Sequence, residues 1–263
     1  MRVGFIGAGR MGAPMVQRLA AAGHHVYALD RTGEKRAAIA ELDAHSVDEV
    51  EETADCADAV VVCVFTDEQV KQVCLESGLL AAMKSGSALI VHTTGSPLTA
   101  EAIAAAAPHV DVIDAPVSGG PHDIATGHVT LFVGGGDDAV ARATPMLCAY
   151  GDPIFHVGPT GSGQKVKLIN NAMFAAQIGL LQQAVELGER LGLPESTLLA
   201  TLPSGSGSSR VAGFVAARGS VDGFIEGVGE FVGKDIAVVR AIASELGSDL
   251  GLLDDVIDAG LRQ

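Results

Sequence analysis

Hydrophobic residues gather in short, nearly continuous runs through the first 160 residues, and amphipathic stretches separate these runs. Continuous apolar runs are typical of strands covered on both faces, whereas apolar positions three and four residues apart indicate helices. This alternation predicts an α/β fold with a doubly wound parallel sheet. The expected strands are residues 2–6, 25–29, 59–65, 88–92, 112–114, 130–133 and 154–156, and the helical stretches include residues 34–42, 67–74, 100–107 and 137–148.

The pattern changes near residue 160, where the glycine- and proline-rich residues 158–163 end the alternation. Beyond them no strand pattern appears, and residues 164–191 form one long helical pattern. We therefore expect an α/β domain at residues 1–162 and an all-helical domain at residues 163–263 that begins with a long interdomain helix. Shorter helices are expected at residues 194–202, 211–217, 234–246 and 250–261.

The first expected strand runs directly into Gly7-x-Gly9-x-x-Gly12, and an amphipathic helix follows. Strand, glycine turn and helix form the context of a dinucleotide fingerprint, although an ordinary βαβ unit is the alternative. The first glycine allows the tight turn, the second lets the backbone approach a pyrophosphate, and the third lets the helix pack closely on the strand. The helix start, with Arg10, Met11 and Gly12, would receive the phosphates. The first domain is therefore predicted to be a Rossmann domain.

The residues after the second expected strand bear on the choice of dinucleotide. Asp30 ends that strand, at the position where an acid meets the adenosine ribose hydroxyls of NAD. Arg31 and Thr32 follow directly and would instead suit the 2′-phosphate of NADP. We expect NAD as the cofactor, with NADP as the alternative.

Ligands of such sheets lie at the carboxyl ends of the strands, so the residues after each strand are candidates. Phe65 ends the third expected strand and Thr66 follows it, and Thr94 follows the fourth. After the fifth strand, Ser118-Gly119-Gly120 forms a turn with a hydroxyl and exposed backbone N–H groups. Such a turn can hold a carboxylate, and a plain connecting loop is the alternative.

The long helix carries the strongest catalytic candidate. Lys167 and Asn171 are four residues apart and therefore share one face of an otherwise apolar helix. A partly desolvated lysine has a lowered pKa and can exchange a proton with an alcohol or carbonyl oxygen. A lysine that extends its charged end to water is the alternative. Lys234, expected at a helix start, suggests contact with an anion or a cofactor amide, or a surface lysine.

Composition narrows the partners. The formal net charge is −15, and no cluster of Lys and Arg appears, which argues against nucleic acid and anionic membranes. The four cysteines show neither CxxC pairing nor metal-ligand spacing, and the N-terminus has no signal-peptide pattern. We therefore expect a cytoplasmic protein without a metal site that acts on a small molecule. The long apolar helix is expected to pair with a second subunit in a homodimer or homotetramer.

Four separated motifs resemble those of the β-hydroxyacid dehydrogenases, a family that includes 3-hydroxyisobutyrate dehydrogenase and tartronate semialdehyde reductase. The N-terminal signature matches residues 4–15, and the substrate loop matches residues 114–120. The catalytic helix matches residues 161–171, and a late cofactor-contact motif matches residues 234–235. Their order and spacing agree over essentially the whole chain.

The resemblance implies reversible hydride transfer between a nicotinamide and a short 3-hydroxy acid or its semialdehyde. It implies that Lys167 exchanges the hydroxyl proton and that Asn171 orients Lys167 or the substrate. Further residues are carried over by motif: Ser118, Gly119, Gly120 and Ser208 on the substrate side, and Thr94 and Lys234 on the cofactor side.

Two other readings stay open at this point. One is an imine reductase-like enzyme or another carbonyl reductase on the same fold, and the other is a catalytically silent nucleotide-binding module. Both kinds of relative generally lack the lysine found here at Lys167. The chain departs from the family pattern at residues 121–129, has Thr93 in place of a usual serine, and ends at Gln263, before the usual C-terminal tail.

Overall fold

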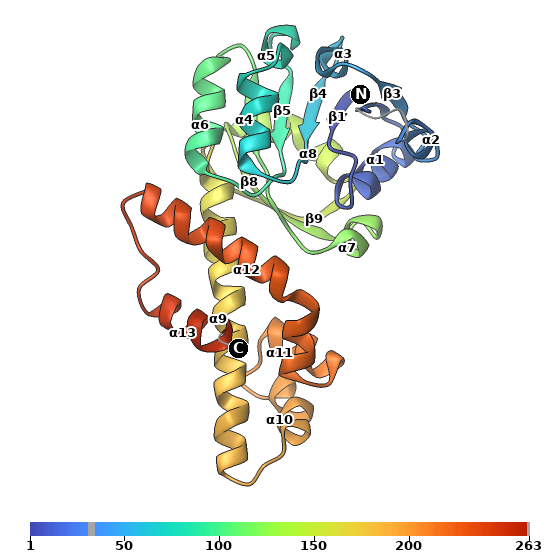
Figure 1. The fold of residues 1–263 in the computed structure, drawn as a ribbon. Helices are drawn as coiled ribbons and strands as arrows, with labels where there is room; N and C mark the ends of the chain where they lie inside the picture. Colours follow the sequence, from blue (N-terminus) through green and yellow to red (C-terminus); the bar gives the residue numbers. More distant parts are fainter. Residues whose placement is uncertain (31–34, 262–263) are drawn as a thin grey trace. The chain divides into compact units, whose positions relative to one another are not determined.

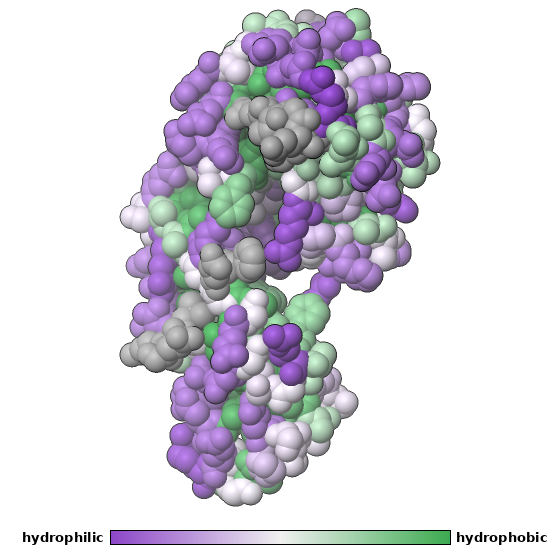
Figure 2. All heavy atoms as spheres, turned by 45° about the vertical axis from the view of Figure 1, so that its right-hand side comes forward, coloured by the Kyte–Doolittle hydropathy of each residue, from purple (hydrophilic) through white to green (hydrophobic). Residues whose placement is uncertain are grey.

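The computed structural model describes residues 1–30 and 35–261. The chain divides into two compact units, residues 1–167 and 168–263 (Figure 1). Hydrophilic side chains dominate the face of the first unit that Figure 2 shows, as expected for a chain with a formal net charge of −15. Across the described ranges, no helix is both long and apolar enough to cross a membrane.

The described residues of the first unit form a nine-stranded sheet in the order β3-β2-β1-β4-β5-β6-β8-β7, with β9 paired to β8. The six neighbouring strands β3, β2, β1, β4, β5 and β6 are parallel, whereas β8 runs antiparallel to β6 and β7. The doubly wound fold is thus confirmed, with an antiparallel addition at one edge. The strands are β1 (Arg2–Ile6), β2 (His25–Leu29), β3 (His45–Val47), β4 (Ala59–Val62), β5 (Ala88–Val91), β6 (Asp111–Asp114), β7 (Val117–Ser118), β8 (Val129–Gly134) and β9 (Gly151–Gly158).

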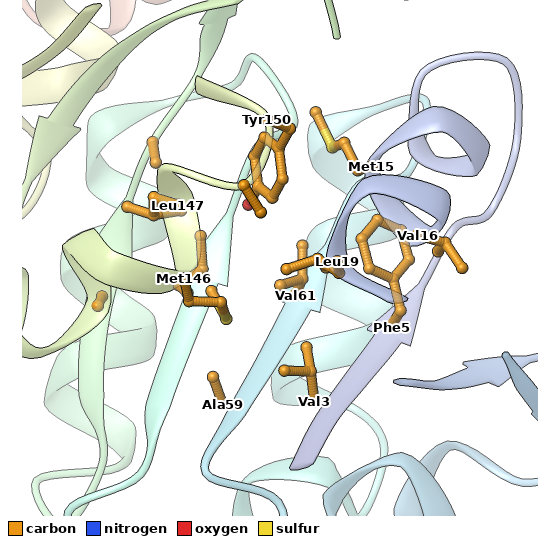
Figure 3. Packing of buried hydrophobic residues seen from close by; sticks show 14 of the residues in the cluster. Val3, Phe5, Met15, Val16, Leu19, Ala59, Val61, Met146, Leu147 and Tyr150 are labelled. Carbon is orange, nitrogen blue, oxygen red and sulfur yellow. The ribbon is translucent and has the colours of Figure 1, made fainter. Parts of the chain in front are cut away.

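Helices cover both faces of this sheet, which is why its strands are apolar on both sides. One face packs against α1 (Gly12–Ala21), α2 (Lys35–Ala40), α7 (Pro121–Ala125) and α8 (Asp137–Leu147). The other packs against α3 (Val50–Ala54), α4 (Asp67–Leu75), α5 (Leu79–Ala82) and α6 (Pro97–Ala106). Figure 3 shows the first of these cores, in which strand residues Val3, Phe5, Ala59 and Val61 lie beside the helix residues Met15, Val16, Leu19, Met146 and Leu147.

Two of the strands, β3 and β7, were not predicted from the hydrophobic pattern. Both are short, with three and two residues, and none of these residues is fully buried. A continuous apolar run is required for the pattern to indicate a covered strand. These edge strands therefore depend on their neighbours, because β2 and β8 supply the hydrogen-bonding partners.

A buried polar pair lies within the first core. The ring of His92 contacts the Ala115 carbonyl through Nδ1 at 2.6 Å and the Tyr150 hydroxyl through Nε2 at 2.8 Å. A carbonyl only accepts hydrogen bonds, so Nδ1 carries the proton and Nε2 accepts from Tyr150. Burial lowers the pKa of His92 from 6.5 to about 4, and the bond to Ala115 partly opposes this shift. The imidazole is therefore neutral at physiological pH.

The second unit is helical throughout its described residues. A long helix, α9 (Ser162–Arg190), starts in the first unit and continues through the second. It packs closely against α13 (Leu252–Leu261), because a Cβ built on Gly260 would lie 2.4 Å from the Gly179 Cα. The remaining elements are α10 (Glu195–Thr201), the 3-10 helix η1 (Leu202–Ser204), α11 (Arg210–Arg218), α12 (Val221–Glu245) and α13 (Leu252–Leu261).

The prediction of a helix at residues 234–246 was wrong about its start. Helix α12 begins at Val221, and the Ser220 hydroxyl caps it by accepting from the Gly223 N–H. Four glycines between residues 223 and 233 weaken the apolar periodicity of the first half, so the pattern showed only the second half. Lys234 consequently lies inside a helix rather than at its first turn.

The buried imidazole generates a prediction about acid stability. Between pH 6.5 and pH 4 the unfolded chain protonates His92 and the folded chain does not, so this contribution to stability is present above pH 6.5 and lost as pH falls. At pH 5 the loss is on the order of 2 kcal/mol. His92→Gln keeps a donor and an acceptor but does not titrate. Urea unfolding should therefore show that the free energy of unfolding decreases less from pH 7.5 to pH 5 in the variant than in the wild type. An equal decrease in both proteins would contradict this assignment.

Candidate functional site

The glycine turn after β1 has the geometry that a dinucleotide requires. Gly7 has a φ of +102°, and a Cβ there would lie 2.2 Å from the Cys63 carbonyl oxygen. A Cβ on Gly12 would lie 2.1 Å from the Gly7 carbonyl oxygen, whereas one on Gly9 would meet no atom within 4 Å. The outer glycines are thus required by packing, and the backbone at Gly9 is open to a ligand. Helix α1 has no acidic residue in its first turn, which suits an anionic pyrophosphate.

Other predicted cofactor residues follow the neighbouring parallel strands. Asp30 directly follows β2, is 3% exposed, and donates its backbone N–H to the Val47 carbonyl at 2.9 Å. Phe65 follows β4 and is 65% exposed, unusual for a large apolar side chain. Thr66 is the N-cap of α4, because its hydroxyl accepts from the Gln69 N–H at 3.2 Å. Arg31 and Thr32 lie outside the described residues.

The loop after β5, which contains Thr94, is held on both sides. Thr93 donates its hydroxyl to the Val64 carbonyl at 2.9 Å and accepts from the Val64 N–H at 3.0 Å. The Gln164 side chain accepts from the Gly95 N–H at 2.9 Å and donates to the Thr93 carbonyl at 2.8 Å. Thr94 therefore lies between two fixed residues. Sequence reasoning missed Gln164, whose amide gives no signal of its own within a helical pattern.

A buried carboxylate fixes the start of α9. Asp114, at the end of β6, is fully buried and accepts from the backbone N–H groups of Gly161 at 2.6 Å and Gln164 at 2.7 Å. Burial raises the pKa of Asp114, and the backbone hydrogen bonds, including one from Gly163, oppose that rise. This is the charge-assisted cap expected at a helix N-terminus. The sequence signal was present, because an acid ends an apolar strand and a glycine-rich helix start follows, but it was not assigned this role.

The predicted substrate loop lies at the same edge of the first unit. Ser118 ends β7 and is half-buried, and Gly119 follows with a φ of +137°. The Gly120 N–H donates to Asp123 Oδ2 at 2.7 Å, so this amide already has an anionic partner. The Gly120 N–H is thus engaged within the loop itself. The role of Asp123 was not predicted, and its position three residues after Gly120 is the signal of a capped helix start.

The two candidates of the long helix have different surroundings. Lys167 is half-buried and lies three residues after Gln164, so Asp114 holds the helix turn directly before it. Asn171, one turn later, is 7% exposed and donates to Asp235 Oδ2 of α12 at 3.3 Å. Asp235 thereby fixes the Asn171 amide, a role that sequence reasoning did not assign. Lys165 is exposed and pairs with Glu101 at 3.4 Å, as expected for a solvated lysine.

The remaining two candidates lie in the second unit. Lys234 is half-buried within α12, next to Asp235. Ser208 is exposed in the loop between η1 and α11, where its N–H donates to the Gly205 carbonyl at 3.0 Å. The structure thus brings Asp30, Thr94, Ser118 and the start of α9 to the carboxyl edge of one sheet. It joins Asn171 and Asp235 within the second unit.

Two family models together match nearly the whole chain. Residues 2–158 match the NAD-binding domain of 6-phosphogluconate dehydrogenase. Residues 161–258 match the domain described as NAD-binding of NADP-dependent 3-hydroxyisobutyrate dehydrogenase. These matches agree with the glycine turn in indicating a nicotinamide dinucleotide as the cofactor.

Individual relatives give the same result. The chain is 32% identical to 2-(hydroxymethyl)glutarate dehydrogenase of Eubacterium barkeri over 80% of its own length and 70% of the relative. It is 33% identical to 3-hydroxyisobutyrate dehydrogenase of Pseudomonas aeruginosa over 79% and 70%. The structure of Mycobacterium tuberculosis 3-hydroxyisobutyrate dehydrogenase with L-serine matches with a TM-score of 0.86 and 27% identity, over 97% of this chain and 91% of that one. The chain therefore belongs to the β-hydroxyacid dehydrogenase family and is an NAD(P)-dependent hydroxyacid dehydrogenase.

Proposed function

We propose that the enzyme interconverts a short 3-hydroxy acid and its semialdehyde, with NAD as the preferred cofactor and Lys167 as the general acid and base. The observation that carries this proposal is the anchoring of Lys167. Its helix is fixed at the turn before it by Asp114 and, through Gln164, to the loop that contains Thr94. A proton-transfer group must be held within hydrogen-bond reach of the reacting oxygen, and this junction supplies such a fixed position.

Each proposed role follows from the chemistry of a side chain. Lys167 accepts the proton of the substrate hydroxyl during oxidation and returns it during reduction. Ser118, through its hydroxyl, and Gly119, through its backbone N–H, bind the substrate carboxylate, with Gly120 shaping the turn. Asn171, fixed by Asp235, orients Lys167 or the substrate from the next helical turn.

The cofactor residues are proposed on the same basis. Gly7, Gly9, Arg10, Met11 and Gly12 form the turn and helix start that hold the pyrophosphate. When bound, the nicotinamide ring supplies the chemistry of accepting or donating the hydride at the substrate carbon. Further contacts are proposed for Asp30 at the ribose, for Phe65, Thr66 and Thr94 along the strand ends, and, from their motifs, for Lys234 at the cofactor and Ser208 at the substrate.

The substrate class rests on the relatives. Those described act on 3-hydroxyisobutyrate and 2-(hydroxymethyl)glutarate, and one structure holds L-serine. All three compounds carry a hydroxyl on the carbon β to a carboxylate. A spectrophotometric screen of short 3-hydroxy acids of this kind with NAD and NADP therefore tests the proposal directly. Absence of turnover with every such acid and semialdehyde would overturn it.

Replacement of the proposed general acid and base should lower turnover strongly. Lys167→Ala is expected to lower kcat by about 10²–10⁴-fold, because positioned proton transfer contributes an effect of this size. The affinity for NADH, measured by fluorescence, should stay within a few-fold of wild type. Lys165→Ala is the matched control, since Lys165 is exposed and pairs with Glu101. Equal kcat values in the two variants would contradict the assignment.

The cofactor preference is predicted from Asp30. A carboxylate at the end of β2 hydrogen-bonds the ribose hydroxyls of NAD and repels the additional phosphate of NADP. We expect kcat/KM to be at least about tenfold higher with NADH than with NADPH, which corresponds to about 1.4 kcal/mol. Asp30→Asn should lower the ratio of kcat/KM with NADH to kcat/KM with NADPH. A wild-type enzyme that prefers NADPH would refute the role of Asp30.

Exposed apolar residues of the second unit support the proposal of a homodimer or homotetramer. Exposed apolar residues recur every four or seven positions along α9 and at the residue directly after it, which places them on one face. Large apolar side chains that are exposed together on one face favour an interface. These residues are Ile169, Met173, Leu180, Leu187 and Leu191, with exposed fractions between 43% and 69%.

Disruption of this apolar face should shift the oligomeric state. We expect wild-type protein to elute as a dimer or tetramer in size-exclusion chromatography with light scattering. Leu180→Asp introduces a charge at the centre of the face and should increase the monomer fraction. Glu189→Lys, at an exposed position of the same helix outside this face, is the control. A monomeric wild-type protein would refute this interface.

We also propose that the protein is located in the cytoplasm. All four cysteines, Cys56, Cys63, Cys74 and Cys148, are free thiols. Free thiols are the usual state in a reducing compartment, which supports this location.

A further inference from the structure

The side chain of Gln164 is buried to an unusual degree. Only 2% of it is exposed, although glutamine is among the residue types that are mostly found at the surface. Burial of an amide is unfavourable unless its donor and acceptor are both satisfied. Here the oxygen accepts from the Gly95 N–H and the nitrogen donates to the Thr93 carbonyl. The amide thus bridges the two peptide groups that flank Thr94.

The backbone of the same residue is held independently. Its N–H donates to Asp114 Oδ2 at 2.7 Å, so Gln164 belongs to the capped first turn of α9. Lys167 lies three residues later, a rise of about 4.5 Å along the helix axis. Gln164 is therefore hydrogen-bonded to the loop after β5 through its side chain and to the end of β6 through its backbone.

The Thr93 hydroxyl and the Ser96 N–H also hold this loop, to Val64 and Asp67, but neither contact satisfies the Gly95 N–H or the Thr93 carbonyl. Gly95 is packed against Asp67, since a Cβ there would lie 2.0 Å from Asp67 Oδ1. An apolar residue at position 164 would leave the Gly95 N–H and the Thr93 carbonyl without their partner in a buried environment. Unsatisfied buried groups cost more than a hydrogen bond contributes, so the loop would rearrange to find new partners. Thr94 would then move relative to Lys167.

We propose that Gln164 is a positioning residue for hydride transfer, which keeps the nicotinamide side of the cofactor site at Thr94 and the proton-transfer group Lys167 in one geometry. This inference rests on the proposed function for the role of Lys167. The hydrogen bonds of Gln164 that link the two groups join protein atoms only. The role is therefore measurable in the free protein as well as during turnover.

The test is Gln164→Leu in the full-length protein, since leucine is apolar and of similar size. Amide hydrogen exchange of the segment around Gly95 should accelerate at least about tenfold in the free protein, because its N–H loses its acceptor. With the hydroxy acid that the wild type oxidises, kcat should fall about 10–100-fold while KM changes less than about threefold, because misplacement affects the transition state more than ground-state binding. The Kd for NADH should rise several-fold.

A matched control separates positioning from general destabilisation. The Ser87 hydroxyl is buried and donates to the Lys84 carbonyl at 2.6 Å, before β5 at the opposite edge of the sheet. Ser87→Ala should lower Tm without changing kcat. If Gln164→Leu accelerates exchange but leaves both kcat and the NADH Kd unchanged, or if exchange is unchanged, the proposal is wrong. If the wild type oxidises no hydroxy acid, the proposed function fails, while exchange and the NADH Kd still decide the role of Gln164.

Gln164→Glu gives a second test should the leucine variant not fold. A neutral carboxyl group reproduces both hydrogen bonds of the amide, whereas a carboxylate cannot donate to the Thr93 carbonyl. Burial and the nearby Asp114 carboxylate both raise the pKa of the introduced group. We expect kcat of this variant to approach the wild-type value at low pH and to fall as pH rises. The wild-type enzyme should not show this fall. A variant whose kcat follows the wild-type pH dependence would overturn the proposal.

Discussion

The buried carboxylate of Asp114 is the contact on which the candidate site depends. It lies at the end of β6 and accepts hydrogen bonds from the first turn of α9, the helix that carries Lys167. A buried charge is strongly unfavourable unless hydrogen bonds surround it, and the N–H groups at a helix start are oriented to provide them. The sheet and the long helix thus satisfy each other, since the helix needs a cap and the carboxylate needs donors. The position of Lys167 follows from this mutual requirement.

The junction also explains two glycines that form no part of the dinucleotide fingerprint. A Cβ on Gly134 would lie 2.4 Å from Asp114 Oδ1, and one on Gly163 would lie 2.4 Å from the Phe132 carbonyl oxygen. Both positions therefore exclude larger residues, because the strand and the helix start approach too closely. The same principle governs the turn at Gly7 and Gly12, where backbone atoms of neighbouring segments occupy the space of a side chain. Close backbone contact at the carboxyl edge thus shapes the glycine turn after β1 and the start of α9 alike.

The second unit contributes in a different way. Its proposed active residue, Asn171, is held by an amide–carboxylate contact to Asp235 between two helices, rather than by a helix cap. The neighbouring Lys234 lies in the interior of α12, where the helix dipole argument that first drew attention to it does not apply. The adjacent Asp235 gives the motif at residues 234–235 a structural explanation, since it fixes the Asn171 amide one turn beyond Lys167.

The sequence by itself determined the elements whose signals are local. Continuous apolar runs predicted the central strands, glycine spacing predicted the turn at Gly7–Gly12, and helical periodicity predicted α9. Edge strands β3 and β7 and the first half of α12 were missed, because their residues carry weak patterns and depend on neighbouring elements. Only the tertiary structure decided the partners of the polar side chains. Gln164 bonds to residues 93 and 95, about 70 positions earlier, and Asp114 to residues 161 and 164, about 50 positions later. Hydrogen bonds over such separations arise from chain topology, which local residue patterns do not encode.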